Sequence, residues 1–233
     1  MPQTAPQDQI TPRALTLPPP YRAEYRAQGG LFAAACAEAV TLGAGALLWS
    51  WRRGDATGPG LLELALILEP EEPLAEARLG FVAAMAALSE AIASHAPPER
   101  AIEIDHPARL IFDKMDLGTA RLAHAPAAED TAPDWMVFAA TLTADRDHLA
   151  EQGAAPGATS LAEEGFTDPP AVVESFAAWF MLYLDRWKHQ GAAAMIAPYA
   201  DRLGGGWVME ADGTFRRGPA QVTLAAALRK GAA

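Results

Sequence analysis

The chain is poor in lysine, in cysteine and in long apolar runs. Lys114, Lys188 and Lys230 are its only lysines, and 18 basic residues face 29 acidic ones, which gives a formal net charge of −11. Such a chain has no basic patch for nucleic acid or anionic lipid, and we expect neither as a partner. The single cysteine, Cys36, excludes an internal disulfide framework. Because no apolar run could cross a membrane and no secretory signal is recognisable, we expect a soluble cytoplasmic protein.

Apolar residues are plentiful, at 51% of the 233 positions, which is enough to bury one sizeable core. The proline-rich residues 1–20 predict an extended arm that becomes ordered where Leu15 and Leu17 touch the body. We expect one main domain over residues 21–203 and a small C-terminal β unit over residues 204–233.

The spacing of apolar residues predicts an α+β fold. Helices are expected over residues 31–41, 73–94, 168–187 and 192–203. Strands are expected over residues 45–51, 61–70, 101–107 and 134–142, with a hairpin within 109–125 and another at Asp212-Gly213. This order predicts a mixed sheet flanked by helices, which we place on one face of the sheet.

The segment from Glu103 to Ala123, EIDHPARLIFDKMDLGTARLA, is similar to the active-site ribbon of biotin and lipoate protein ligases. Pro107 stands at the family's proline, and Leu117 and Gly118 stand at its Leu-Gly pair. The family's Ala-Thr-Ser-Leu segment has its counterpart in ATSLAEEG, residues 158–165, and a helix that contains tryptophan follows it. Together with the helix and strands before this ribbon, the resemblance extends over residues 31–203. It implies the class II synthetase-like catalytic-domain fold of that family.

The resemblance also implies an adenylating ligase. In the family, the carboxylate of biotin, lipoate or octanoate attacks ATP in the presence of Mg²⁺, and a lysine of a biotinyl or lipoyl carrier domain captures the acyl adenylate. The attack brings like charges within about 3 to 4 Å, so the chemistry needs cations or backbone N–H groups. A glycine- and arginine-rich loop covers the anhydride in the family. Its counterpart here is residues 52–60, in which Arg52, Arg53 and Gly54 are candidate ligand-binding residues, although two arginines in a loop are also typical of solvated surface charges.

Two charges of the ribbon depart from the family pattern. Where the family has an acidic residue and, seven positions later, a lysine, this chain has Arg109 and Asp116. A carboxylate at the second position would repel both the acyl carboxylate and the phosphate. Two interpretations are open. In the first, Lys114 leaves the same strand face as Asp116 and rebuilds a catalytic cationic site with Arg109 and Arg121. In the second, Arg109 and Asp116 form a swapped ion pair across the hairpin.

The remaining candidates follow from the same alignment. His106 stands at the family's tryptophan and is expected to line the ligand pocket with Asp116, while Gly118 and Thr119 would let the backbone approach the ligand. Cys36 lies within an apolar helix, where a thiol is usually buried and unreactive, although octanoyltransferases of the superfamily use a cysteine nucleophile. The five histidines show no spacing typical of metal ligands, so no metal site is expected.

Three functions are therefore in competition. The first is a ligase-like protein that binds a small acyl carboxylate or its adenylate and acylates a carrier lysine with ATP. The second is a degenerate member of the same fold that binds a ligand or a protein without catalysis. The third is a cysteine-dependent octanoyl transferase.

Overall fold

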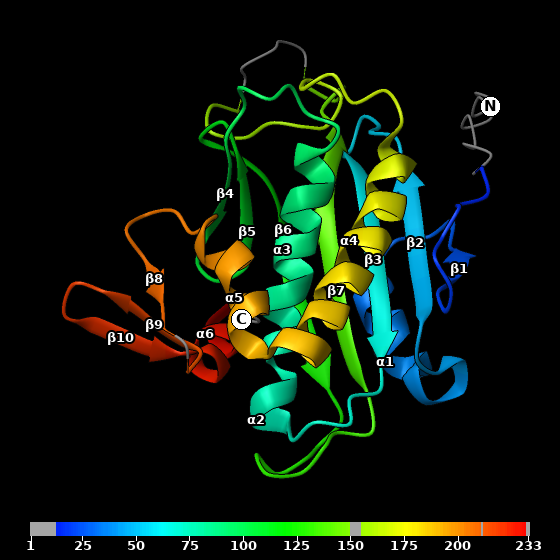
Figure 1. Ribbon diagram of the computed structural model, residues 1–233. Coiled ribbons are helices and arrows are strands. Elements are labelled where there is room, and N and C mark those ends of the chain that lie inside the picture. The colour runs from blue at the N-terminus through cyan, green and yellow to red at the C-terminus, as the bar shows by residue number, and fades with distance from the viewer. Residues whose placement is uncertain (1–12, 150–154, 211, 232–233) are drawn as a thin grey trace.

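Seven strands form one mixed sheet through the centre of the molecule (Figure 1). The computed structural model describes residues 13–149, 155–210 and 212–231. Only the outermost pair, β1 with β2, is parallel, and every other pair of neighbours is antiparallel. In spatial order the strands are β1 (Arg22–Tyr25), β2 (Ala46–Arg52), β3 (Gly60–Leu68), β7 (Met136–Asp145), β6 (Met115–His124), β5 (Arg109–Phe112) and β4 (Ile102–Asp105).

One face of the sheet carries most of the helical mass. Helix α3 (Leu79–Ala93) is almost entirely buried because its alanines let it lie close to both the sheet and α4 (Pro169–Gln190). The shorter α5 (Ala192–Ala200) packs against both helices. Phe138 of the sheet stacks on Phe176 of α4 with ring centres 5.5 Å apart, so aromatic residues at helical spacing form the core here.

The opposite face is covered by α1 (Leu31–Leu42), so our expectation of helices on one face was wrong. Leu31, Ala35 and Ala39 of this helix are buried against alternate residues of β2, β3 and β7 in a second, smaller core. This core ends at the first residues of α1. Beyond them, the same sheet face continues with polar side chains, which no helix in the described part of the chain covers.

Within the main domain, the predicted elements are confirmed except at two places. The helix expected over 73–94 is divided at Arg78 into α2 (Leu74–Ala77) and α3. The first amides of α2 donate hydrogen bonds to the carbonyls of Glu129 and Thr131 in a neighbouring loop. Strand β1 was missed, since RAEY has no apolar alternation; Leu15 and Leu17 before it pack against the core.

The C-terminal segment forms a small β unit, as predicted; it has three strands, where we expected a hairpin, and a helix follows. Its elements are β8 (Val208–Met209), β9 (Thr214–Arg217), β10 (Ala220–Thr223) and α6 (Leu224–Gly231). Phe215 and Leu224 are buried in the main core, so the unit is docked on the body.

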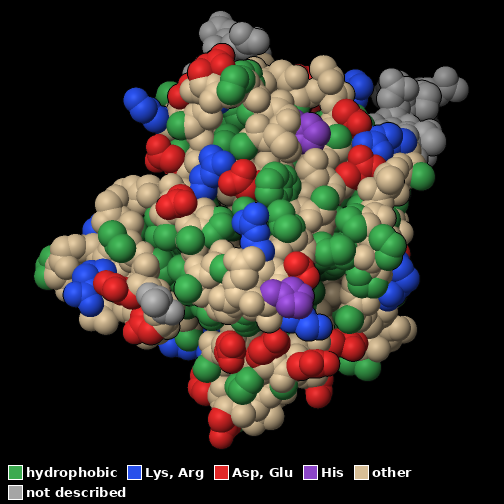
Figure 2. Space-filling model, in the orientation of Figure 1, with side chains coloured by type: hydrophobic (Ala, Val, Ile, Leu, Met, Phe, Trp, Pro, Cys, Tyr) green, Lys and Arg blue, Asp and Glu red, His purple; other side chains and the backbone are tan. Residues whose placement is uncertain are grey.

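Acidic side chains gather at the end of the molecule where α2 lies (Figure 2), and no broad basic patch is visible on that face. None of the helices in the described ranges is long and apolar enough to span a membrane.

Candidate ligand pocket beside helix α1

A row of polar side chains crosses the open half of the α1 face. Glu63 of β3 pairs with Thr141 of β7, Thr141 pairs with Thr119 of β6, and Thr119 pairs with Arg109 of β5. Directly paired residues project from the same face of a sheet. The row therefore runs from the start of α1 toward β5 over three strand spacings, or about 14 Å.

A pocket of about 350 Å³ lies where this row meets α1. Its polar lining residues are Gly30, Glu63, Thr119, Arg121 and Thr141, and Phe32 is among its apolar ones. This volume is at the lower end of the range for small-molecule sites, about 300 to 1,000 Å³.

Arg121 supplies the available positive charge of this pocket. Its guanidinium carbon lies 5.9 Å from the centre of the Phe32 ring, which orients the group over the pocket. Among the described residues, no carboxylate forms an ion pair with Arg121. The amino end of α1 also faces the pocket through Gly30 and adds to the local positive potential. The pocket is therefore suited to an anionic group.

Glu63 closes the other side of the pocket and is largely buried, with 10% of its side chain exposed. Its Oε1 accepts a hydrogen bond from Gly30 N (3.1 Å), and its Oε2 accepts one from Arg52 Nη2 (3.1 Å). A Cβ atom at Gly29 would collide with this carboxylate and with the guanidinium of Arg52, so a side chain there would displace the pair. Glu63 thus fixes the turn before α1 and neutralises Arg52.

Residues 52–60 form a closed hairpin loop, which the carboxylate of Asp145 at the end of β7 holds in place. Asp55 and Gly58 exchange two backbone hydrogen bonds, and Gly54 N donates to both carboxylate oxygens of Asp145, at 3.0 and 3.1 Å. Cβ atoms at Gly54 or Gly60 would collide with the same carboxylate. Asp145 is 7% exposed, and its carboxylate already accepts the hydrogen bonds of the Gly54 amide, which we had assigned to a ligand. Arg53 is exposed beside it.

Arg109 and Asp116 form the swapped ion pair of our second interpretation. Arg109 Nη2 lies 2.5 Å from Asp116 Oδ2, and its Nη1 lies 3.2 Å from Asp105 Oδ2. These contacts turn the guanidinium away from the α1 pocket, because Asp116 lies toward the hairpin tip and Arg121 in the opposite direction along β6.

Our first interpretation, a cationic site rebuilt around Lys114, was wrong. Lys114 is exposed in the two-residue turn between β5 and β6, with a φ of 71°, and is not in an extended strand. Arg121 stands seven positions further along β6, about 23 Å away at the rise of a strand. Lys114 and Arg121 therefore cannot contact one ligand carboxylate.

The contacts of Gly118 and His106, two further candidate ligand-binding residues, give both a role in packing. A Cβ at Gly118 would collide with the carbonyl of Thr141, so this glycine permits the close approach of β6 and β7. His106 does not line the α1 pocket: its ring lies 4.4 Å from that of Trp207 and 4.1 Å from that of Phe215, against the C-terminal unit. Burial lowers the pKa of His106 to about 4, so the ring is neutral near pH 7.

Cys36 is half-buried in the middle of α1, beside the second core. Burial raises the pKa of its thiol, which is the reverse of what a thiolate nucleophile needs. In the described part of the chain, no three His, Cys, Asp or Glu side chains are grouped so that they could hold a metal ion.

Sequence reasoning missed Glu63, Thr141 and Asp145. Glu63 carried a usable signal, since it is the one charge inside the apolar run LLELALIL. A single acid in a buried strand predicts a partner or a ligand. Thr141 and Asp145 gave no such signal, because polar residues are ordinary toward the end of a strand.

Comparison with known proteins agrees with this architecture. The chain belongs to the biotin/lipoate A/B protein ligase family, whose model matches residues 17–201. No sequence among proteins with curated descriptions matches significantly.

Solved structures show the same fold. A biotin protein ligase-like protein of unknown function from Silicibacter sp. TM1040 is 24% identical, with a TM-score of 0.73 over 90% of this chain and 96% of its own. Biotin protein ligase from Aquifex aeolicus, in complex with biotin and ATP, is 17% identical, with a TM-score of 0.52 over 78% and 76%. The Leishmania major enzyme, in complex with biotinyl-5-AMP, is 13% identical, with a TM-score of 0.54 over 87% of both chains. The expected family and its catalytic-domain fold are confirmed.

Proposed function

We propose that this chain binds a small carboxylic acid, such as biotin, lipoate or octanoate, in the α1 pocket without adenylating it. The observation that supports this proposal is which of three arginines around the site form ion pairs. Glu63 pairs with Arg52 and Asp116 pairs with Arg109, whereas no described carboxylate pairs with Arg121, which lines the pocket. One available cation suits one carboxylate.

The pocket supplies complementary contacts for both ends of such an acid. Arg121 and the Thr119 hydroxyl would receive the carboxylate, and charge-assisted hydrogen bonds of this kind are stronger than neutral ones. Phe32, Leu31 and Ala139 would contact the apolar part of the acid. Among the described residues that line this pocket, Arg121 is the one cation, which argues against a polyphosphate beside the acid.

ATP and Mg²⁺ do not fit the residues of this loop. The Gly54 amide already donates to Asp145, and a phosphate placed there would meet that buried carboxylate at close range. Asp116 adds a further negative charge at the position of the family's lysine. No adenylation step is therefore derived for this chain.

Ligase activity remains the second candidate because of family membership. Relatives of this fold have been solved with biotin and ATP and with biotinyl-5-AMP. If this chain acts in the same way, a biotinyl or lipoyl carrier domain would be its partner. The cysteine-dependent transferase has no support from geometry, since burial raises the pKa of Cys36.

Calorimetric titration with octanoate and with octanamide tests the proposal. We expect octanoate to bind and octanamide to bind at least about tenfold more weakly, because one charge-assisted contact is worth about 1.5 kcal/mol or more. Arg121→Gln should weaken octanoate by a similar factor. Lys114→Ala removes a cation in the exposed turn and should change nothing. Equal binding of acid and amide, or equal losses in the two variants, would refute the site. Biotin and lipoate are titrated in parallel to identify the acyl group.

Pyrophosphate exchange into ATP, measured with Mg²⁺ and each acid, separates the two candidates. We expect no exchange. Exchange with one acid would establish the ligase reaction and name its substrate.

A further inference from the structure

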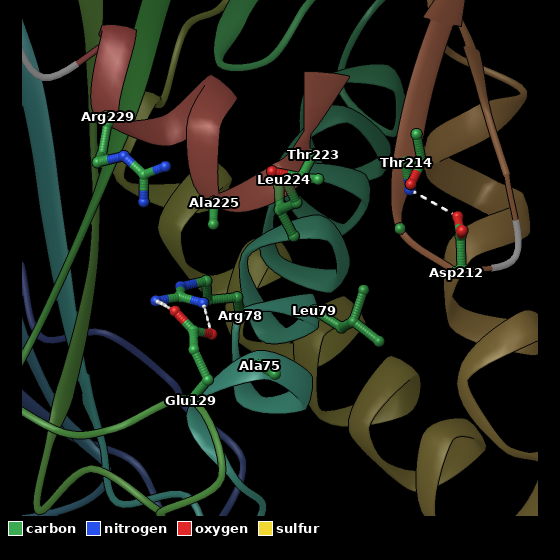
Figure 3. A pocket seen from close by; sticks show the side chains of 11 residues that line it. Ala75, Arg78, Leu79, Glu129, Asp212, Thr214, Thr223, Leu224, Ala225 and Arg229 are labelled. Carbon is green, nitrogen blue, oxygen red and sulfur yellow. Dashed lines mark hydrogen bonds and ion pairs between the residues drawn. The ribbon is translucent and has the colours of Figure 1, made fainter. Parts of the chain in front are cut away.

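A second pocket, of about 400 Å³, lies between the main body and the C-terminal unit (Figure 3). Its walls come from the junction of α2 and α3, from the loop that carries Glu129, and from the start of α6. It lies outside the α1 pocket, with which it shares no lining residue.

Arg78 is the buried charge of this second pocket. Only 10% of its side chain is exposed, whereas the side chain of its partner, Glu129, is 63% exposed. The two groups form a double contact, with Arg78 Nη2 2.9 Å from Glu129 Oε1 and a second bond between Nη1 and Oε2. A buried cation needs an anion beside it, but an exposed glutamate can return to water. Another anion can therefore replace Glu129 at Arg78.

A second guanidinium faces the same place. Arg229 of α6 lines the pocket and is exposed, and within the described residues no carboxylate forms an ion pair with it. Its charge, with that of Arg78, contributes to lowering the pKa of Glu129; the Arg78 hydrogen bond is the largest cause. Figure 3 shows Arg78 and Arg229 at one end of the pocket. Asp212, at the other end, already accepts a hydrogen bond from Thr214 N at 2.9 Å.

Helix α6 also begins at this pocket. Thr223 caps it by accepting a hydrogen bond from Ala226 N at 3.3 Å, and Leu224 and Ala225 of the first turn are lining residues. The positive end of the helix therefore adds to the two guanidinium groups. Two arginines against one exposed glutamate leave a net positive charge at this end of the pocket.

We propose that this pocket binds a small, multiply charged anion, of the phosphate or dicarboxylate class, which displaces Glu129 and bridges Arg78 to Arg229. Since Arg78 belongs to the body and Arg229 to α6, the bound anion would fasten the C-terminal unit to the sheet domain. The site would respond to an anionic metabolite separately from the acid in the α1 pocket.

Thermal unfolding in inorganic phosphate, compared with sodium chloride of equal ionic strength, tests this site. Phosphate about tenfold above its Kd should raise the Tm by about 3 to 5 °C relative to chloride. Arg229→Gln should abolish the difference. Arg216→Gln, the same change at an exposed arginine of the same unit, should retain it. Glu129→Gln removes the competing carboxylate and should tighten phosphate about tenfold.

Three results would overturn the proposal: equal Tm values in phosphate and chloride, equal losses in the Arg229 and Arg216 variants, or weaker phosphate binding after Glu129→Gln. A phosphate effect that disappears with Arg121→Gln but survives Arg229→Gln would place the anion in the α1 pocket and also refute it.

Discussion

Exchanging the charges of Arg109 and Asp116 should leave the protein nearly as stable as before, whereas reversing either charge alone should not. The two side chains are 52% and 35% exposed and lie on neighbouring strands. Exposed ion pairs contribute about 0.2 to 1 kcal/mol, so the loss of the pair by itself is a small effect.

Each single reversal adds repulsion to that loss. Asp116→Lys sets an ammonium against Arg109, and two like charges at 4 Å repel by about 1 kcal/mol in water. We therefore expect it to lower the free energy of unfolding by about 1.5 kcal/mol. Arg109→Asp should cost about 2 kcal/mol, since Asp105 also contacts Arg109 and three carboxylates would then share one site. The double variant restores opposite charges and should lie within about 1 kcal/mol of the original.

Urea denaturation followed by circular dichroism measures the three differences. The predicted coupling energy is at least about 2.5 kcal/mol. A double variant whose loss equals the sum of the single losses would show that Arg109 and Asp116 do not interact, and the swapped-pair account would fail. Because the double variant also restores the family's lysine, pyrophosphate exchange should be measured on it. Exchange should remain absent while Asp145 holds Gly54.

Three further predictions concern single side chains. Glu63→Gln should lower the free energy of unfolding by about 1 to 2 kcal/mol, because it weakens the bonds to Arg52 and Gly30, and urea denaturation checks it. The pKa of His106 is lowered to about 4 in the folded protein, so the unfolded chain takes up this proton first as the pH falls from about 6.5. The protein should lose stability between pH 6.5 and 4, and His106→Phe should lose less over that range; equal slopes would contradict the assignment. Cys36 should react with iodoacetamide at pH 7.5 at least about tenfold more slowly in the folded than in the urea-unfolded protein, as mass spectrometry would show.

Local chemistry made most of the elements predictable. The acidic first turn before residue 79 and the apolar spacing after it marked a helix, and the run LLELALIL marked a buried strand. The spacing of apolar residues does not indicate on which side of the sheet a helix packs. Helix α1 is rich in alanine and has no strongly apolar stripe, and only tertiary packing places it opposite α3.

The candidate site was predictable only in part, for a similar reason. Arg52, Gly54 and Asp116 were recognisable as positions in a family pattern, but their partners lie far away in the sequence. Gly54 meets Asp145, which lies 91 positions further along the chain, and a sequence gives no sign of such a contact. The prediction for Lys114 was wrong because this residue lies in the turn between β5 and β6, whereas we expected it in an extended strand beside Asp116.

The contacts of the site explain how this fold can be stable without a bound polyphosphate. A pocket built for an anionic ligand concentrates cations and free amides, which repel one another or remain unpaired when the ligand is absent. In this chain Glu63 neutralises Arg52, Asp116 neutralises Arg109, and Asp145 accepts from the loop amide. An external phosphate that approached Arg52, Arg109 or the Gly54 amide would therefore meet a carboxylate of the protein already bound there. Among the described residues, no carboxylate pairs with Arg121, whereas Arg52 and Arg109 are both paired. We therefore assign the α1 pocket to a monocarboxylate.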